Sequence, residues 1–137
     1  MRFLIINGPN LANIGRREPE IYGSDDFETY LNSLRNSFLE HKIDYFQSDS
    51  EGEIVKKLHQ SVGNFDGIVM NAGAYSHSSY AIRDAVAAIS TKVVMVHISN
   101  VYSRENFRHE NVIAANCSGI VTGFGLKSYL LAIESFL

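Results

Sequence analysis

The sequence is notable first for what it has little of. It contains one cysteine, Cys117, so no disulfide can form within the chain, which is typical of a protein from a reducing compartment. Its 12 Lys and Arg are outnumbered by 15 Asp and Glu, which excludes the basic surface that nucleic acid or an anionic membrane requires. No apolar run approaches the ~18 residues of a membrane-spanning helix, and the start, MRFLIIN, is too short and unsuitably flanked for a signal peptide. These absences predict a cytoplasmic protein.

Motifs for cofactors and metals are also missing. There is no GxxxxGK[ST] phosphate loop, and GFGLKS at 123–128 follows the last predicted strand, so it reads as a tight turn rather than a dinucleotide loop. No GxSxG motif accompanies Ser78 and Ser79. The histidines show none of the HxH, HxxxH or HExxH spacings of metal sites; they are His41, His59, His77, His97 and His109. We therefore expect neither a metal nor a cofactor.

The 137 residues, of which 45% are apolar, suit one domain over residues 1–137 with a substantial core. Short apolar runs predict strands, and apolar residues at three-to-four spacing predict helices. The predicted strands are Phe3–Ile6, Ile43–Phe46, Gly67–Met70, Lys92–Ile98 and Gly119–Val121. The predicted helices run from Asp25 to Phe38, from Ile54 to Val62, from Ala81 to Ile89 and from Leu126 to Leu137, the first with Ser24, Asp25 or Asp26 as its cap.

This alternation of apolar strands and helices predicts a parallel sheet that is covered on both faces. Right-handed crossovers then give a doubly wound α/β fold. For a chain of this length we expect a flavodoxin-like, five-stranded parallel sheet in the order 2-1-3-4-5, with helices on both faces.

A doubly wound sheet binds its ligand beyond the carboxyl ends of the strands. The side chains predicted to meet there are Asn71, His77, His97, Ser99 and Arg108. They offer hydrogen-bond donors for a small polyhydroxylated acid. Each also has a simpler interpretation: His97 as a core-edge histidine bonded to backbone, His77 as a helix cap, and Arg108 as a solvated charge.

The segment GRREPEIYG at 15–23 leaves the first strand at this same edge. It lies in a long loop at about 11–24, and loops of this length are uncommon unless they act as lids. An ordinary tyrosine, with a pKa of about 10, is a poor base at neutral pH, but a neighbouring guanidinium favours the phenolate. Tyr22 beside Arg16 or Arg17 could therefore act as a base on a lid that hinges at Gly15 and Gly23. The alternative is a tyrosine that packs the loop against its own domain.

A set of motifs spread over nearly the whole chain resembles the type II 3-dehydroquinate dehydratase family. The motifs are INGPNL at 6–11, GRREPEIYG at 15–23, QSDSEGEI at 47–54, NAGAYSHSS at 71–79, IRDA at 82–85, VHISN at 96–100 and RENFRH at 104–109. The resemblance implies the flavodoxin-like fold and a step of the shikimate pathway, the dehydration of 3-dehydroquinate to 3-dehydroshikimate through an enolate. It also implies that no metal or cofactor takes part.

The resemblance further implies roles for particular residues. Tyr22 matches the base that removes the C2 proton, and Arg17 matches the arginine that lowers its pKa. Asn10 matches the residue that holds a water against the enolate, and His97 matches the general acid. The other matches are Asn71 to orient His97, Ile98 and Ser99 for the carboxylate, His77 and Arg108 for ring hydroxyls, and Asp84 for the site of a neighbouring subunit. A trimer, commonly four trimers in a dodecamer, is the assembly that this family implies.

The sequence departs from the family pattern in two places. Met95 stands where a glutamate usually precedes the general-acid histidine, and Glu110 and Asn111 stand where small or basic polar residues are more usual. A carboxylate at position 95 would orient the imidazole and raise its pKa. We therefore expect that His97 is held differently or that another carboxylate substitutes. A non-catalytic flavodoxin-like module that binds a small acid or a flavin is the alternative function.

Overall fold

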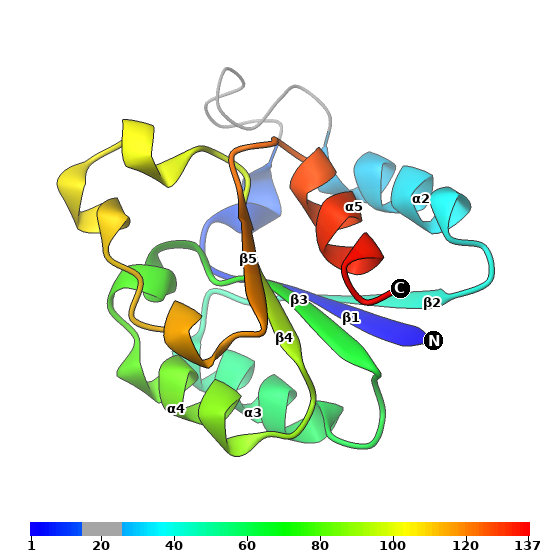
Figure 1. Ribbon diagram of the computed structural model, residues 1–137, viewed down its shortest axis with the longest axis horizontal. Helices are drawn as coiled ribbons and strands as arrows, with labels where there is room; N and C mark the ends of the chain where they lie inside the picture. The colour runs from blue at the N-terminus through cyan, green and yellow to red at the C-terminus, as the bar shows by residue number, and fades with distance from the viewer. Residues whose placement is uncertain (15–25) are drawn as a thin grey trace.

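The computed structural model describes residues 1–14 and 26–137, and its centre is a five-stranded parallel sheet in the order β2-β1-β3-β4-β5 (Figure 1). The strands are β1 (Arg2–Asn7), β2 (Lys42–Gln47), β3 (Gly67–Asn71), β4 (Val93–His97) and β5 (Gly119–Thr122). In register, Leu4 of β1 lies between Asp44 of β2 and Ile68 of β3. The predicted strands and their order are confirmed.

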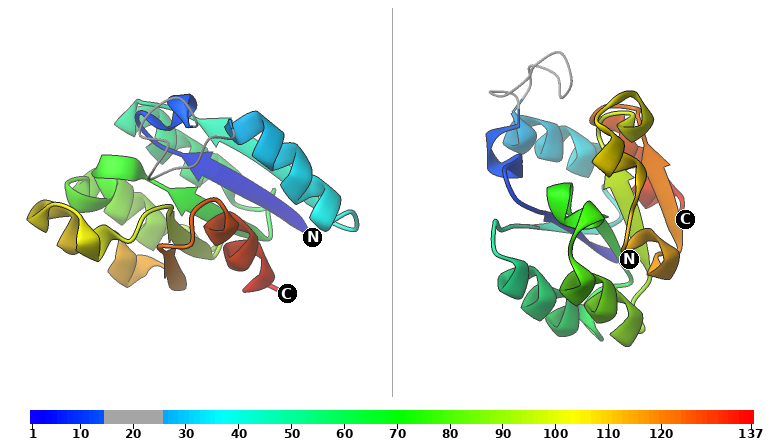
Figure 2. Two further views of the ribbon diagram at one scale, coloured as in Figure 1. Left: turned by 90° about the horizontal axis from the view of Figure 1, so that it is seen from above. Right: turned by 90° about the vertical axis from the view of Figure 1, so that its left-hand side faces the viewer.

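The α-helices lie in two layers, one on each face of the sheet (Figures 1 and 2). The first layer holds α2 (Phe27–Ser37) and α5 (Lys127–Glu134), and the second holds α3 (Glu51–Ser61) and α4 (Tyr80–Ala88). None of the helices in the described part of the chain has the length and apolar character that a bilayer crossing requires. The flavodoxin-like, doubly wound prediction is therefore confirmed.

The two-sided burial follows from the alternation of side chains along each strand. Phe3 and Ile5 of β1 pack with residues of α2 and α5, whereas Leu4 and Ile6 pack with residues of α3 and α4. Successive side chains of a strand point to opposite faces, so a solidly apolar strand can fill two cores at once. Each core holds its helices through their apolar stripes, such as Leu31 and Leu34 of α2.

Side-chain caps define the starts of three helices. Asp26 accepts from the Thr29 N–H at the start of α2, and Ser50 accepts from the Glu53 N–H at the start of α3. The cap of α4 is Ser79, whose hydroxyl accepts from the Ile82 N–H. The alternative in which His77 caps this helix is therefore wrong.

The carboxyl edge of the sheet carries the 3₁₀ turns η1 (Leu11–Asn13), η2 (Gly73–His77), η3 (Val101–Ser103) and η4 (Asn106–His109) (Figure 1). A further turn, η5 (Ala114–Asn116), comes just before β5 begins, and η3, η4 and η5 all belong to the crossover from β4 to β5. Of the lid predicted at about 11–24, residues 11–14 are described: they form η1 and end at a buried Ile14. Residues 15–24 of that lid, with Tyr22, Arg16 and Arg17, lie outside the described residues.

The loops after β1 and β3 approach each other more closely than side chains would allow. A Cβ at Gly8 would lie 2.5 Å from the backbone oxygen of Ala72, and the Gly8 N–H donates to the Asn71 oxygen at 2.7 Å. In the β3 loop, Gly73 has φ of +60° and packs against Pro9, a conformation that glycine adopts without strain. The two glycines thus bring η1 and η2 together at the edge of the sheet.

We expect Gly8→Ala to lower the free energy of unfolding by about 1–3 kcal/mol, because the added methyl group has backbone atoms in its way. Gly52→Ala is the matched control: its Cβ would meet nothing nearer than the Ser50 hydroxyl at 3.9 Å, and Gly52 lies in α3. Alanine in that helix should leave stability unchanged or raise it by up to about 1 kcal/mol. Urea denaturation of both variants tests the difference, and equal effects would contradict the close approach.

Candidate active site at the carboxyl edge of the sheet

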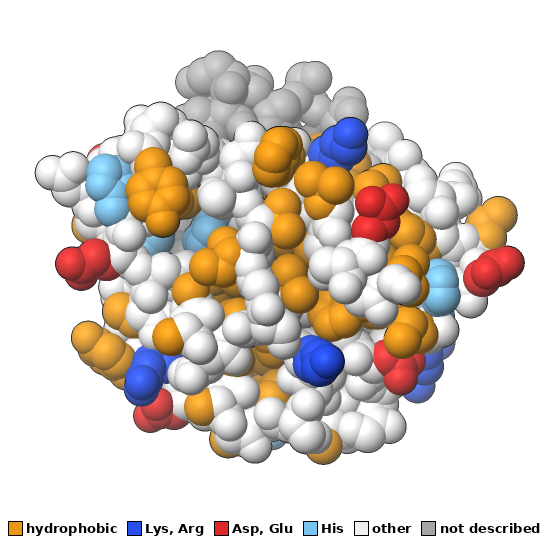
Figure 3. Space-filling view, viewed as in Figure 1, with side chains coloured by type: hydrophobic (Ala, Val, Ile, Leu, Met, Phe, Trp, Pro, Cys, Tyr) orange, Lys and Arg blue, Asp and Glu red, His pale blue; other side chains and the backbone are white. Residues whose placement is uncertain are grey.

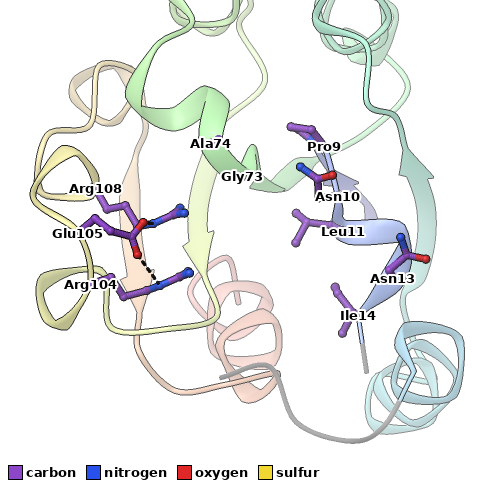
Figure 4. Close-up of a pocket in the computed structure, with 10 residues that line it drawn as sticks. All are labelled: Pro9, Asn10, Leu11, Asn13, Ile14, Gly73, Ala74, Arg104, Glu105 and Arg108. Carbon is purple, nitrogen blue, oxygen red and sulfur yellow. Dashed lines mark hydrogen bonds and ion pairs between the residues drawn. The ribbon is translucent and has the colours of Figure 1, made fainter. Parts of the chain in front are cut away.

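A polar cavity lies between η1 on one side and the η3–η4 segment on the other (Figure 4). Its volume is about 210 Å³, below the roughly 300–1,000 Å³ of sites for drug-sized ligands, which suits a small ligand. The residues that line it are Pro9, Asn10, Leu11, Asn13, Ile14, Gly73, Ala74, Arg104, Glu105 and Arg108.

A smaller cavity of about 40 Å³ adjoins the first and shares Leu11, Gly73, Arg104 and Arg108 with it. Its remaining lining residues are Asn71, His77, His97, Ile98, Ser99 and Val101. The position of the strand ends predicted that five side chains would meet at this edge. The cavity brings all five together: Asn71, His77, His97, Ser99 and Arg108.

Asn10 begins the site in a left-handed backbone conformation, with φ of 67°. Asparagine tolerates this region better than most residues do. Its N–H donates to Asp49 Oδ1 at 3.0 Å, and the same oxygen accepts from Gln47 Nε2 at 3.1 Å. The loop after β2 therefore fixes the backbone of Asn10 at the cavity wall.

His97 is the last residue of β4 and is 7% exposed. Its Nε2 lies 3.2 Å from Nδ2 of Asn111, and the same amide nitrogen lies 2.8 Å from Sδ of Met95. The group beside the imidazole is thus an amide, and residues 1–14 and 26–137 supply no substitute carboxylate there. Burial, and then the nearby charges of His77 and Arg108, lower the pKa of His97 to about 4. The ring is therefore neutral at pH 7.

His77 stacks on His97 with ring centroids 6.0 Å apart and an angle of 14° between the rings. Its Nδ1 lies 2.6 Å from the backbone oxygen of Glu110, so this nitrogen must carry a proton and donate it. Phe107 of η4 packs edge-on against the ring, with centroids 5.8 Å apart. The η4 turn and the residue that follows it therefore hold His77 in place.

Two arginines supply positive charge to the site. Arg108 donates from Nε to Glu105 Oε2 at 2.8 Å, and this hydrogen bond is the main cause that lowers the pKa of Glu105. Nη1 of Arg104 lies 3.5 Å from the Ser99 hydroxyl. Arg104 of the motif RENFRH had no role predicted from the sequence. Its four-residue spacing from Arg108 is the signal that could have found it, because the turn from the end of η3 into η4 brings both arginines onto the cavity.

Asn71 lies in the lining, but it does not orient His97 through a hydrogen bond as the resemblance implied. Its Nδ2 donates to the Tyr129 hydroxyl at 3.0 Å, and its Oδ1 accepts from the Gly73 N–H at 3.2 Å. One end of the amide thus ties Asn71 to α5, and the other end holds the loop after β3. The residue that contacts the imidazole is Asn111, which sequence reasoning noted only as a departure from the family.

Asp84 lies apart from both cavities. It is on α4, its side chain is 73% exposed, and it pairs with Arg83 at 3.2 Å. Across residues 1–14 and 26–137, no group of three or more His, Cys, Asp or Glu side chains could hold a metal ion. The donors of the cavities are amides, imidazoles and guanidinium groups, which suit an anionic or hydroxylated ligand.

Fold and site together define a flavodoxin-like α/β protein with a small, positively charged polar site at the carboxyl edge of its sheet. The whole chain, residues 1–137, matches the family described as dehydroquinase class II, and the chain belongs to that family. The resemblance stated from the motifs is thus confirmed, and the alternative of a non-catalytic binding module is not favoured.

Known relatives agree with this assignment. The chain is 48% identical over 140 residues to a 3-dehydroquinate dehydratase of Prochlorococcus marinus. The alignment covers 100% of this chain and 96% of the relative. It is 45% identical to one of Pelodictyon phaeoclathratiforme, covering 100% and 92% of the two chains. The crystal structure of a type II dehydroquinase from Butyrivibrio crossotus superposes with a TM-score of 0.95 at 45% identity, covering 99% of this chain and 97% of that one.

We expect stability to fall as pH decreases from about 6.5 to about 4, because the unfolded state binds a proton at His97 before the folded state does. A depression of this size corresponds to about 3 kcal/mol at full effect. Urea unfolding of His97→Gln across this range should show a shallower fall than the wild type. The control is His59→Gln, at an exposed position of α3, which should keep the wild-type slope. Parallel curves for all three proteins would contradict a neutral, buried His97.

Proposed function

We propose that this chain catalyses the dehydration of 3-dehydroquinate to 3-dehydroshikimate, by anti elimination through an enolate and without a metal or cofactor, as a step of the shikimate pathway. The observation that carries the proposal is the identity of 45–48% along the full chain to proteins of that activity. The cavity between η1 and η4, small and lined by donors, supports it.

The proposed base is Tyr22, with Arg17 as the cation that favours its phenolate and Arg16 as a secondary neighbour. A proton alpha to a ketone is weakly acidic, so a phenolate can remove it once the enolate oxygen is stabilised. Ile14, the last residue described before this segment, lines the cavity, which supports a lid at about 11–24 on one catalytic domain of residues 1–137.

The remaining roles are assigned to residues around the two cavities. His97, neutral at rest, takes up a proton from solvent and donates it to the departing C1 hydroxyl, and Asn10 holds the water that stabilises the enolate. The carboxylate binds at Ser99 and the backbone amides after His97, including that of Ile98. His77 and Arg108 bind ring hydroxyls, and Asn71 supports this wall through the Gly73 loop. The proton lost from C2 goes to Tyr22 and then to solvent, and the hydroxyl takes the proton of His97 and leaves as water. His97 thereby returns to its neutral form, so atoms and charges balance.

We propose a trimer-based assembly, with four trimers in a dodecamer, for the cytoplasmic enzyme. Asp84 lies outside the cavities of its own chain and is largely exposed, which supports a role in the site of a neighbouring subunit. The edge strand β5 leaves Ile120 51% exposed, and Figure 3 shows hydrophobic side chains gathered on the face that carries β5. An apolar face of this kind supports burial between subunits.

The first test is ultraviolet absorbance after the purified protein is mixed with 3-dehydroquinate. We expect a rising signal from the conjugated enone of the product, and we expect Tyr22→Phe to lose it by at least about 100-fold, because the variant has no phenolate. Tyr80→Phe is the control, since Tyr80 is 65% exposed on α4.

The outcomes of that assay test the proposed function and the proposed base separately. No signal from folded wild-type protein would reject the dehydratase function. A signal that survives in Tyr22→Phe would keep the function and reject the proposed base.

Arg17→Ala should raise the apparent pKa of the basic group in the pH–rate profile, because the phenolate loses a nearby cation. Turnover should fall more than substrate binding does, since the missing interaction stabilises the charged base. Steady-state kinetics across the pH range measures both effects. An unchanged pH profile would remove Arg17 from its role.

A further inference from the structure

The amide of Asn111 has a defined orientation. Its Oδ1 accepts from the backbone N–H groups of Ile113 at 3.0 Å and Ala114 at 2.9 Å, at the start of η5. An amide NH₂ group cannot accept from these donors, so the oxygen must face η5. The nitrogen then faces β4, where it meets Met95 and His97.

This orientation determines the protonation of the imidazole. Nδ2 of Asn111 can only donate, and it lies 3.2 Å from Nε2 of His97, so Nε2 must present a lone pair. A neutral imidazole has one N–H, which must then be on Nδ1. A proton on Nε2 would point at the amide hydrogens, so the doubly protonated ring is disfavoured by the same contact.

Glu110, the residue before Asn111, fixes the ring proton of His77 in the same manner. The Glu110 carbonyl accepts from Nδ1 of His77, which places the proton of that ring on Nδ1 as well. The segment is anchored beside the ring, because the Val112 N–H donates to the Ser76 oxygen at 2.8 Å. Consecutive residues 110 and 111 therefore contact both stacked histidines through groups of fixed polarity.

We propose that Asn111 is a positioning residue that holds the His97 imidazole through Nε2 and fixes its single ring proton on Nδ1. Nδ1 has no hydrogen-bond partner within the described residues, so it is the nitrogen left to meet a ligand. Resting on the proposed function, this means that the departing hydroxyl receives its hydrogen bond from Nδ1–H.

The surroundings of His97 favour a neutral partner at Nε2. Met95 is fully buried, and its thioether is a weak acceptor without charge. Among the residues that the structure describes, the titratable and charged groups that act on the ring are His77 of η2 and Arg108 of η4, and both oppose a second proton. Asn111 also favours the neutral ring, and in addition it determines which ring nitrogen carries the proton.

The test is the ring tautomer, read from long-range ¹H–¹⁵N correlation spectra of the intact protein labelled with ¹⁵N-histidine. In the wild type we expect Nδ1 of His97 to carry the proton by about tenfold or more over Nε2, the preference that one hydrogen bond provides. Asn111→Asp is nearly isosteric, and its carboxylate can still accept from Ile113 and Ala114. Its other oxygen would accept from Nε2–H, so the proton should move to Nε2 and the pKa of His97 should rise by about 1 or more.

Asn116→Asp is the matched control, because Asn116 is an exposed residue of η5, the turn whose first N–H groups bind Asn111, and its own amide donates to the Arg83 oxygen. It adds the same charge and should leave the His97 tautomer and pKa as in the wild type. A proton on Nε2 in the wild type, or the same tautomer and pKa in Asn111→Asp as in the wild type, would overturn the proposal.

The same spectra separate this proposal from the proposed function, since they are recorded without substrate. If the protein lacks dehydratase activity but the tautomer moves in Asn111→Asp, Asn111 keeps its role and the proposed function fails. If the protein is an active dehydratase but the tautomer does not move, the proposed function stands and Asn111 loses its role. In an active enzyme, Asn111→Asp should also shift the pH–rate profile, whereas Asn116→Asp should not.

Discussion

The position of the site depends on a buried chain of hydrogen bonds that crosses the sheet beneath it. The Tyr129 hydroxyl of α5 donates to Asn7 Oδ1 at 2.7 Å and accepts from Asn71 Nδ2 at 3.0 Å, while Asn7 Nδ2 donates to the Tyr45 hydroxyl at 3.2 Å. Burial raises the pKa of Tyr129 far above its usual range, so the hydroxyl keeps its proton and its donor role. The chain joins β2, β1, α5 and β3, and every member restrains the next because an unpaired polar group there would be costly.

The hydrogen-bonded side chains restrain the cavity walls through contacts with the backbone. Asn71 holds the Gly73 N–H, and Gly73 packs on Pro9, so the loops after β1 and β3 are fixed to each other. Asp49 then fixes Asn10 from the loop after β2. Side chains on short, restrained turns can be placed more accurately than side chains on long loops. The η1 and η2 walls of the cavity are therefore held in place by their contacts with the sheet.

Sequence reasoning predicted the fold well because the signals were local. Runs such as Phe3–Ile6 and the helical spacing of Leu31 and Leu34 determine the elements, and parallel topology then carries Asn71 and His97 to one edge. The hydrogen-bond partners of these side chains could not be predicted from such local signals. Residues 98–118 have no periodicity, so the places of Arg104 and Asn111 depend on how this crossover packs. The contact of Asn71 with the buried Tyr129 could not be predicted, because Tyr129 is distant in sequence.

The pair of Met95 and Asn111 shows how a neutral arrangement can hold an imidazole in a buried place. A carboxylate at position 95 would be fully buried in β4 and would need a charged or well-bonded partner to offset its desolvation. With methionine there, nothing charged is buried, and the task of holding His97 passes to an amide whose oxygen is already satisfied by η5. The cost is a histidine whose pKa is low before any ligand arrives. A carboxylate next to the ring would favour its charged form, whereas the amide favours the neutral ring. The two arrangements therefore differ in the proton that the imidazole holds at rest.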